Sequence, residues 1–216
     1  MLRRWYKMGP MAYTSEPKFR VLHALRIKGF AKLDHITPLA GVDEPLVQTH
    51  LEAMLSEGLT AFREARGLWQ LTPVGREAHP PLLHADTGRP GFRDGLAKSY
   101  PAFLETNEEF KALCGDWQLR DGAPNDHSDA SYDKKVLARL TKLDDNAKKI
   151  VVNFGQVAER FGPYAPRLEQ SRRALEGGQQ NMFTGVMCGS YHDVWMELHE
   201  DLILSQNINR SEEGSF

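Results

Sequence analysis

The sequence predicts a mainly α-helical protein, in which three short helices and a β-hairpin precede an all-α helical bundle domain. Three observations support this fold class. Apolar residues recur at helical spacing through most of the 216 residues, a short stretch near residue 65 alternates around a glycine instead, and a Pro- and Gly-rich stretch at 79–92 separates the two parts. We therefore expect domains at 1–85 and 90–207, followed by a flexible tail at 208–216.

The N-terminal part divides into helices and one hairpin. The predicted elements are helices at 17–29, 31–39 and 43–57, a hairpin at about 59–71 and a helix at about 73–80. Asp43 can cap the third helix and Gly58 ends it, whereas Gly67 supplies the turn of the hairpin. The apolar stripe of the third helix consists of Val47, Leu51, Met54 and Leu55.

Three helices followed by a hairpin form a winged helix-turn-helix. The stretch GVDEPLVQTHLEAMLSEGLTAFREARGLWQLTPVGREA resembles the winged-helix bacterial transcription regulators, the MarR-like and related groups. In that pattern a glycine and a cap residue open the recognition helix, V-x-x-H-L forms its core, G-L leads into the wing, and L-T-P-x-G-R closes it. The matching residues are Gly41, Asp43, Val47, His50, Leu51, Gly58, Leu59, Leu71, Thr72, Pro73, Gly75 and Arg76. The resemblance covers about residues 16–80.

The resemblance implies that the helix 43–57 enters the major groove of double-stranded DNA, while the wing touches the backbone or the minor groove. The expected DNA-contact residues are Gln48, Thr49, Arg63, Arg66 and Lys32. This helix has no Lys or Arg and several acidic residues, which departs from the usual pattern. A winged helix used for protein contacts or as a scaffold therefore remains an alternative, in which the chain is a ligand-binding or protein-interaction module.

Charge is divided unevenly along the chain. Residues 1–85 carry 11 Lys/Arg against 8 Asp/Glu, a net charge of +3, whereas residues 86–216 carry 16 against 21, a net charge of −5. This division favours an N-terminal part that meets a polyanion and a C-terminal part that does not.

The C-terminal part is predicted to be helical throughout, with no second strand pattern. The predicted helices are two between 91 and 114 that meet near Pro101, one at about 130–161, one at 163–178, and a last one at about 180–207 with a bend around 185–189. Helices with apolar stripes pack as an all-α bundle, which we expect to sense a ligand or to form a dimer.

A polar tract, CGDWQLRDGAPNDHSDASYD at 114–133, interrupts the helices. One interpretation is a loop that folds over a pocket of the bundle and binds a polar ligand. The candidate ligand-binding residues in it are Trp117, Arg120, Asn125, His127 and Tyr132. The alternative is a solvated connection in which Ser128 or Asp129 caps the next helix.

The stretch SYHDVWMELHEDL at 190–202 predicts a helix buried on two sides. Tyr191, Val194, Trp195, Leu198 and Leu202 share its apolar face. His192, Trp195 and His199 are candidate ligand-binding residues, although satisfied structural histidines are the simpler interpretation. His192 and His199 are seven residues apart, about 10 Å along the axis, so one metal ion cannot use both, and we predict no metal and no cofactor.

The sequence has no phosphate-binding loop, GxGxxG, HExxH or GxSxG motif, so we predict no enzyme. A third hypothesis, a metalloprotein or enzyme that uses His127, His192 and His199, stays open. No apolar run approaches 18 residues, no signal-peptide pattern is present, and Cys114 and Cys188 form no CxxC pair, so we expect no membrane partner and a cytoplasmic location. The prediction is a homodimeric transcriptional regulator with double-stranded DNA and a small-molecule effector as partners.

Overall fold

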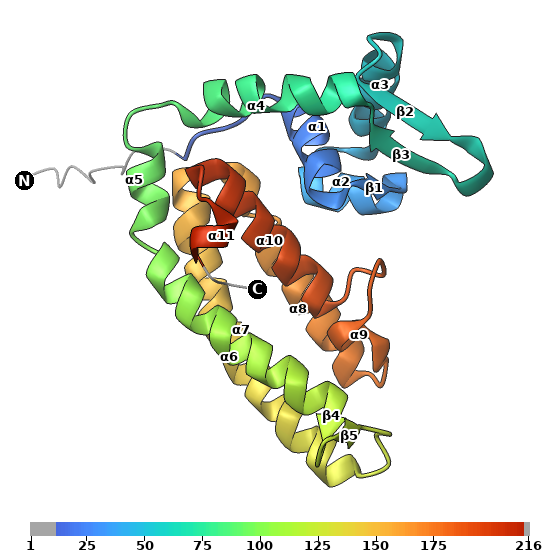
Figure 1. Cartoon of the computed structure of the whole chain (residues 1–216), viewed down its shortest axis with the longest axis vertical. Coiled ribbons are helices and arrows are strands. Elements are labelled where there is room, and N and C mark those ends of the chain that lie inside the picture. The colour runs from blue at the N-terminus through green and yellow to red at the C-terminus, as the bar shows by residue number, and fades with distance from the viewer. Residues whose placement is uncertain (1–11, 214–216) are drawn as a thin grey trace, which may run out of the picture.

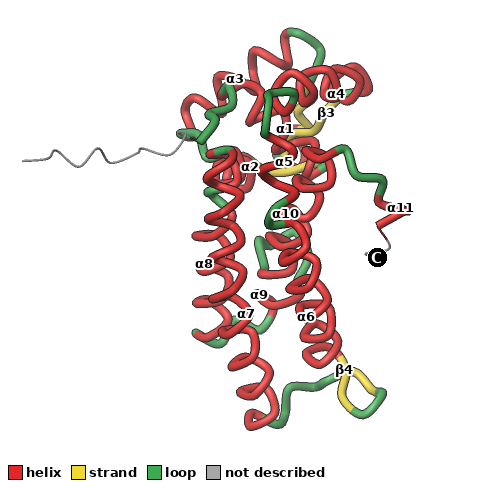
Figure 2. Tube along the Cα trace, turned by 90° about the vertical axis from the view of Figure 1, so that its left-hand side faces the viewer, coloured by secondary structure: helices red, strands yellow, loops and turns green. Residues whose placement is uncertain are grey.

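The computed structural model describes residues 12–213 and shows a mainly helical protein (Figure 1). Its N-terminal helices and a small sheet lie at one end, and α4 connects them to a bundle of longer helices that extends away from them. Figure 2 shows the same elongated arrangement after a quarter turn. The structure describes the tail predicted at 208–216 only as far as Glu213. This part contains the short helix α11 (Arg210–Glu213), and residues 214–216 lie outside the described residues.

The N-terminal unit, residues 17–87, is built from three helices, a sheet and a connecting helix. Its elements are α1 (Pro17–Lys28), β1 (Phe30–Ala31), α2 (Leu33–Ala40), α3 (Glu44–Ser56), β2 (Thr60–Arg63), the 3-10 turn η1 (Glu64–Arg66), β3 (Leu68–Leu71) and α4 (Pro73–Thr87). The sheet is antiparallel in the order β1-β3-β2. The predicted hairpin thus gains a third strand, because Phe30 and Ala31 pair with Gln70 and Trp69.

The bundle consists of the remaining elements. They are α5 (Phe92–Ala97), α6 (Tyr100–Gln118), β4 (Leu119–Arg120), β5 (Ala123–Pro124), α7 (Ala130–Val157), the 3-10 turn η2 (Glu159–Phe161), α8 (Tyr164–Glu176), α9 (Asn181–Thr184), α10 (Tyr191–Gln206) and α11. The prediction of no strand in this half is wrong by one small hairpin, β4–β5, at the far end of α6 and α7. The bend expected around 185–189 is a complete break between α9 and α10.

Two details of the N-terminal unit differ from the sequence prediction. The sequence predicts a helix at about 73–80 after the hairpin, but α4 continues through Pro80 and Pro81 to Thr87. It continues because His79 and Leu83 bury one side of the helix, and such packing overrides the local cost of proline. The sequence predicts Leu55 on the buried stripe of α3, but Leu55 is 43% exposed, whereas the other members of the stripe are buried.

A single apolar core runs through both parts of the molecule. At the bundle end it is rich in fully buried aromatic rings, namely Phe103, Phe110, Phe154, Phe161, Tyr191 and Trp195. The apolar face predicted for the helix 190–202 is confirmed, since all its members are at most 1% exposed. Because α1 and α4 also contact α10, the N-terminal unit is packed on the bundle rather than tethered to it.

Candidate functional site

The residues expected to contact DNA come from three neighbouring elements of the N-terminal unit. Lys32 precedes α2, Gln48 and Thr49 lie on α3, Arg63 ends β2, and Arg66 lies in η1. All of them are exposed except Gln48, which is half-buried. The side chains of Lys32 and Arg66 form no ion pair or hydrogen bond with another described residue. The structure therefore leaves two cations on this side of the sheet available to an external anion.

The other three expected DNA-contact residues are engaged within the protein. Gln48 Nε2 donates to Glu52 Oε1 at 2.5 Å, and the Thr49 hydroxyl donates to a carbonyl of its own helix at 2.8 Å. Arg63 Nε donates to Gln70 Oε1 at 2.9 Å, which leaves its terminal nitrogens for other partners. Direct base contacts by Gln48 and Thr49 of α3 would have to break existing hydrogen bonds. Phosphate contacts by the terminal nitrogens of Arg63 would not.

The polar tract forms a compact cluster at the end of α6 and α7, which we call the hairpin knot (residues 117–133). Asn125 Nδ2 donates to the Trp117 carbonyl at 3.0 Å and to Asp133 Oδ1 at 3.2 Å. His127 Nδ1 donates to the same carboxylate, 3.1 Å from Oδ2, and its ring lies 4.3 Å from the Trp117 ring. His127 adopts a left-handed conformation with φ 58°, which these contacts hold in place.

The two remaining candidates of the tract join the same knot. Arg120 pairs with Asp129 at 3.0 Å, and its guanidinium lies 4.8 Å from the ring centre of Tyr132. The Tyr132 hydroxyl donates to the Asp116 carbonyl at 2.8 Å. Asp129 also accepts backbone N–H bonds at the start of α7, so the cap that the alternative interpretation expects is present. The structure thus brings all five candidates together and bonds them mainly to other residues of the polar tract.

Asn125→Ala is expected to lower the free energy of unfolding by about 1–3 kcal/mol, because it removes one of the two side-chain donors of the Asp133 carboxylate and leaves the Trp117 carbonyl without its side-chain donor. Gln118→Ala is the control, since the Gln118 side chain is exposed at the end of α6 and should change stability by no more than about 0.5 kcal/mol. Urea unfolding followed by far-UV circular dichroism measures both. Equal stability of the two variants would show that the hairpin knot does not stabilise the fold.

The candidates on α10 have different surroundings. Trp195 is fully buried, its Nε1 donates to Asn107 Oδ1 at 2.9 Å, and it stacks on Phe103. His199 is buried beside the same ring, with Nε2 3.1 Å from Oε2 of Glu213. His192 is half-buried and keeps a buried Nδ1 without a hydrogen-bond partner in the described chain. Residues 12–213 contain no cluster of three or more His, Cys, Asp or Glu side chains suited to a metal ion.

The hairpin knot and α10 do not form one pocket wall. Trp117 contacts Phe183 of α9, with ring centres 5.0 Å apart. Phe183 in turn contacts Phe110, which lies against His192 and Trp195. Within the described chain, therefore, an aromatic layer separates the polar atoms of the knot from the histidines of α10.

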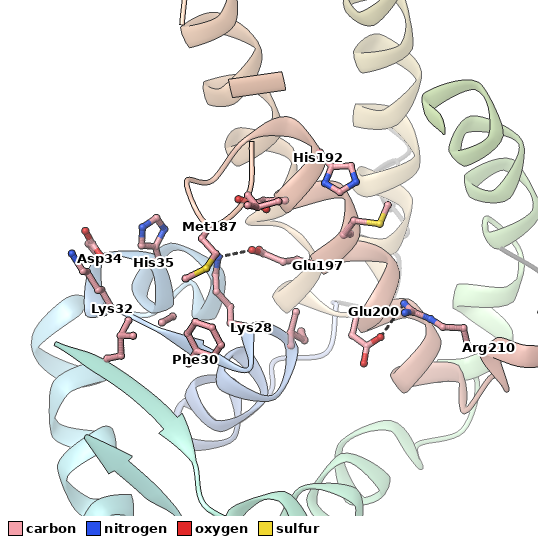
Figure 3. Close-up of a pocket in the computed structure, with 16 residues that line it drawn as sticks. Lys28, Phe30, Lys32, Asp34, His35, Met187, His192, Glu197, Glu200 and Arg210 are labelled. Atoms are coloured by element: carbon pink, nitrogen blue, oxygen red, sulfur yellow. Dashed lines mark hydrogen bonds and ion pairs between the residues drawn. The ribbon is translucent and has the colours of Figure 1, made fainter. Parts of the chain in front are cut away.

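A cavity of about 570 Å³ opens instead between the N-terminal unit and α10 (Figure 3). This size is typical of sites for small molecules. On one side it is lined by α1, β1 and the start of α2, and on the other by the 185–189 loop and α10. Its apolar lining is provided by Ile27, Phe30, Leu68, Val186, Met187 and Met196. Of the predicted residues, it contains Lys32 and His192.

The charges deep in this cavity are neutralised within the protein. Glu197 is buried and accepts hydrogen bonds from Lys28 on one carboxylate oxygen and from Arg167 on the other. Glu200 pairs with Arg210 at 3.1 Å. Figure 3 shows both the Lys28–Glu197 and the Glu200–Arg210 pairs spanning the space beside α10. A ligand would therefore meet ion-paired charges beside α10, the Asp193 carboxylate bonded to backbone N–H groups, and charges without an ion pair at the α2 end.

Behind the cavity, a buried polar cluster joins the N-terminal unit to the bundle, and we call it the junction cluster. Its members are His23 (α1), His79 and Asp86 (α4), Arg160 (η2), Tyr164 (α8), and Asp201 and Ser205 (α10). Asp201 accepts from Arg160 and, at 3.0 Å, from His23 Nε2, and His23 Nδ1 lies 2.8 Å from His79 Nε2. The Tyr164 hydroxyl donates to the other oxygen of Asp201 at 3.1 Å.

Two pKa shifts follow from this burial. Burial by itself raises the pKa of the Asp201 carboxyl, but the Arg160 guanidinium and His23 outweigh it and hold the pKa below its usual range. Burial, together with the nearby His23 and Arg26, lowers the pKa of His79 to about 3. The Asp201 carboxyl is therefore ionised beside the Arg160 guanidinium at neutral pH, and the His79 ring is neutral.

Sequence reasoning missed the junction cluster, although one signal was present. Asp201 is seven residues after Val194 and three after Leu198, so helical geometry places it on the apolar face of α10. A carboxylate at such a position needs a buried partner. Its partners, Arg160 and His23, come from distant segments and carry no comparable signal of their own.

Within residues 12–213, no helix combines the length and the apolarity needed to cross a bilayer. Comparison with protein-family models, with curated proteins and with solved structures finds no match to this chain.

Proposed function

We propose that the chain is a DNA-binding transcriptional regulator whose affinity for DNA depends on a small effector bound between the N-terminal unit and α10. The observation that supports it is the order of elements in the N-terminal unit, α1-β1-α2-α3-β2-β3 with an antiparallel β1-β3-β2 sheet. This order is the one expected of a winged helix-turn-helix, in which α3 would be the recognition helix and the β2–β3 turn the wing.

The L-T-P-x-G-R motif has a physical role in this unit. Thr72 accepts from the Gly75 N–H at 3.0 Å, which caps α4, and donates to the Gly58 carbonyl at 2.6 Å. A Cβ at Gly75 would collide with the carbonyl of Leu59, so only glycine fits there. These contacts fix the start of β2 against the end of β3, which supports reading the motif as the closure of a wing.

The charges favour contact through the wing and the start of α2 rather than through α3. Asp43, Glu44, Glu52 and Glu57 make α3 and its flanks acidic, and Lys18 already pairs with Glu57 at 2.6 Å. Among the predicted DNA contacts, exposed Lys32, Arg63 and Arg66 are the cations available for phosphates. We therefore expect affinity to come mostly from the DNA backbone and to be strongly dependent on salt.

The position of the cavity offers a way for a bound effector to change the affinity for DNA. Phe30 and Lys32 line it immediately before α2, and Leu68 lines it from β3, so elements of the winged unit form one wall. The opposite wall belongs to the bundle. A ligand that contacts both walls favours one orientation of the unit relative to the bundle, and affinity for DNA then changes by population shift.

The test is fluorescence anisotropy of a labelled duplex from the region upstream of its own gene, titrated at several salt concentrations. Arg63→Ala/Arg66→Ala should weaken binding and reduce the salt slope by about two, one unit for each lost phosphate contact. Lys134→Ala/Lys135→Ala is the charge-matched control, since both lysines are exposed on α7 at the far end of the bundle. No salt-dependent binding at micromolar protein, or equal effects of both double variants, would contradict the proposal.

A protein-binding winged helix is the second candidate, favoured by the acidic flank of α3 and its exposed Leu46 and Leu55. Under it the wild-type protein binds no duplex even at low salt, and the wing variants have no effect on DNA. The anisotropy titration therefore separates the two candidates in one experiment.

A further inference from the structure

We infer that the cavity between the N-terminal unit and α10 binds an amino acid with a large apolar side chain, or a molecule of the same zwitterionic, amphipathic chemistry. The inference rests on the proposed function, because it names the ligand class of the same cavity. Ligand binding is measured on the protein without DNA. The ligand inference and the proposed DNA binding can therefore fail independently of each other.

The cavity displays apolar side chains that the fold itself leaves uncovered. Phe30 is 46% exposed on the N-terminal wall, and Met187 and Val186 are 64% and 75% exposed on the opposite wall. Such side chains are usually buried, and burying each against a ligand contributes favourable free energy in proportion to the covered area. The two walls therefore suit a ligand with an apolar body.

The loop that presents Val186 and Met187 is fixed rather than loose. The backbone N–H groups of Cys188 and Gly189 donate to Asp193 Oδ2 at 2.9 and 3.0 Å, and the Ser190 hydroxyl donates to the Gly185 carbonyl at 2.5 Å. Met187 is held in a left-handed conformation with φ 59°, which a non-glycine residue adopts at a cost. This strained turn holds the apolar Met187 side chain at the wall of the cavity. Backbone strain of this kind is common at binding sites, which supports a binding role.

The polar end of the ligand follows from the charges that stay unpaired. Lys32 and Asp34 flank the start of α2, are exposed, and have no ion-pair partner in the described chain. Figure 3 shows them with His35 at one end of the cavity, with Phe30 and Met187 next to them. An ammonium group and a carboxylate within two residues provide one partner each for the carboxylate and the ammonium of an amino acid.

The remaining charges argue against a strongly charged ligand. Lys28 and Arg167 are already paired with buried Glu197, and a second ion bound there would have to displace one member of these buried pairs. A buried pair that loses one member costs more than a new contact returns. A phosphate or a polyamine would therefore bind poorly, whereas a zwitterion adds no net charge to the cavity.

The test is isothermal titration calorimetry of the full-length protein with L-phenylalanine and L-tryptophan, beside phenethylamine and 3-phenylpropionate, which each keep one of the two charges. We expect saturable binding of the amino acids and at least about tenfold weaker binding of both analogues. Lys32→Gln and Asp34→Asn should each lower the affinity for L-phenylalanine by about tenfold. Met187→Ser, at an exposed position, should weaken it severalfold without a loss of stability.

Lys149→Gln is the matched control, because Lys149 is exposed on α7 and away from the cavity. It should bind the amino acids like the wild type. No saturation up to about 10 mM of either amino acid would overturn the inference. So would either analogue binding as tightly as L-phenylalanine, or unchanged affinity in the Lys32 and Asp34 variants.

Discussion

Replacing Asp201 by asparagine is expected to lower the free energy of unfolding by about 3–5 kcal/mol, because it removes the main counter-charge of buried Arg160. Arg160 is 4% exposed and cannot turn to water. Asp86 remains, but its carboxylate reaches the guanidinium only at 3.4 Å. The same change weakens the bond from His23, which is one of several polar links between α1 and α10.

The control is Glu200→Gln, one residue earlier on the same helix. Glu200 also pairs with arginines, Arg26 and Arg210, but their side chains are 38% and 47% exposed, and solvated pairs contribute at most about 1 kcal/mol. Urea unfolding of both variants, followed by circular dichroism and tryptophan fluorescence, measures the difference. Similar losses in the two variants would mean that the junction cluster does not hold the N-terminal unit on the bundle.

Most helices could be predicted because their signals are local. The apolar face of α10, the glycine that ends α1 and the threonine that caps α4 depend on residues a few positions apart. The strand β1 could not be predicted, since Phe30 and Ala31 become a strand only by pairing with Gln70 and Trp69, forty residues away. The continuation of α4 past its two prolines depends on distant packing in the same way.

The candidate site was harder to predict than the fold. The sequence drew attention to the histidines, tryptophan and acidic loop, and the structure brings the loop residues together but bonds them to one another. The cavity arises where β1, the start of α2 and the 185–189 loop meet, and these segments are about 155 residues apart. Asp34 and Met187 belong to no sequence motif, and they line the cavity only because these distant segments lie side by side in the fold.

Trp195→Ala is expected to lower the free energy of unfolding by about 3–5 kcal/mol, the usual loss when a buried tryptophan is truncated. Its ring is 0% exposed and stacks on Phe103 with centres 5.0 Å apart. Trp195→Phe should cost less, about 1–3 kcal/mol, because it keeps much of the ring but leaves Asn107 Oδ1 buried without its indole donor. Thermal and urea unfolding of both variants give the two values.

Met196→Ala is the matched comparison, because Met196 is the next residue on α10, is half-buried and lines the cavity. It should destabilise the protein by only about 1 kcal/mol while weakening any apolar ligand of the cavity, which a core position such as Trp195 does not touch directly. Trp195→Ala could instead cause a mild loss of stability and a specific loss of ligand binding. That result would support the prediction that Trp195 lines a ligand-binding pocket. Since the two residues are neighbours on one helix, the comparison separates core from cavity without a change of structural context.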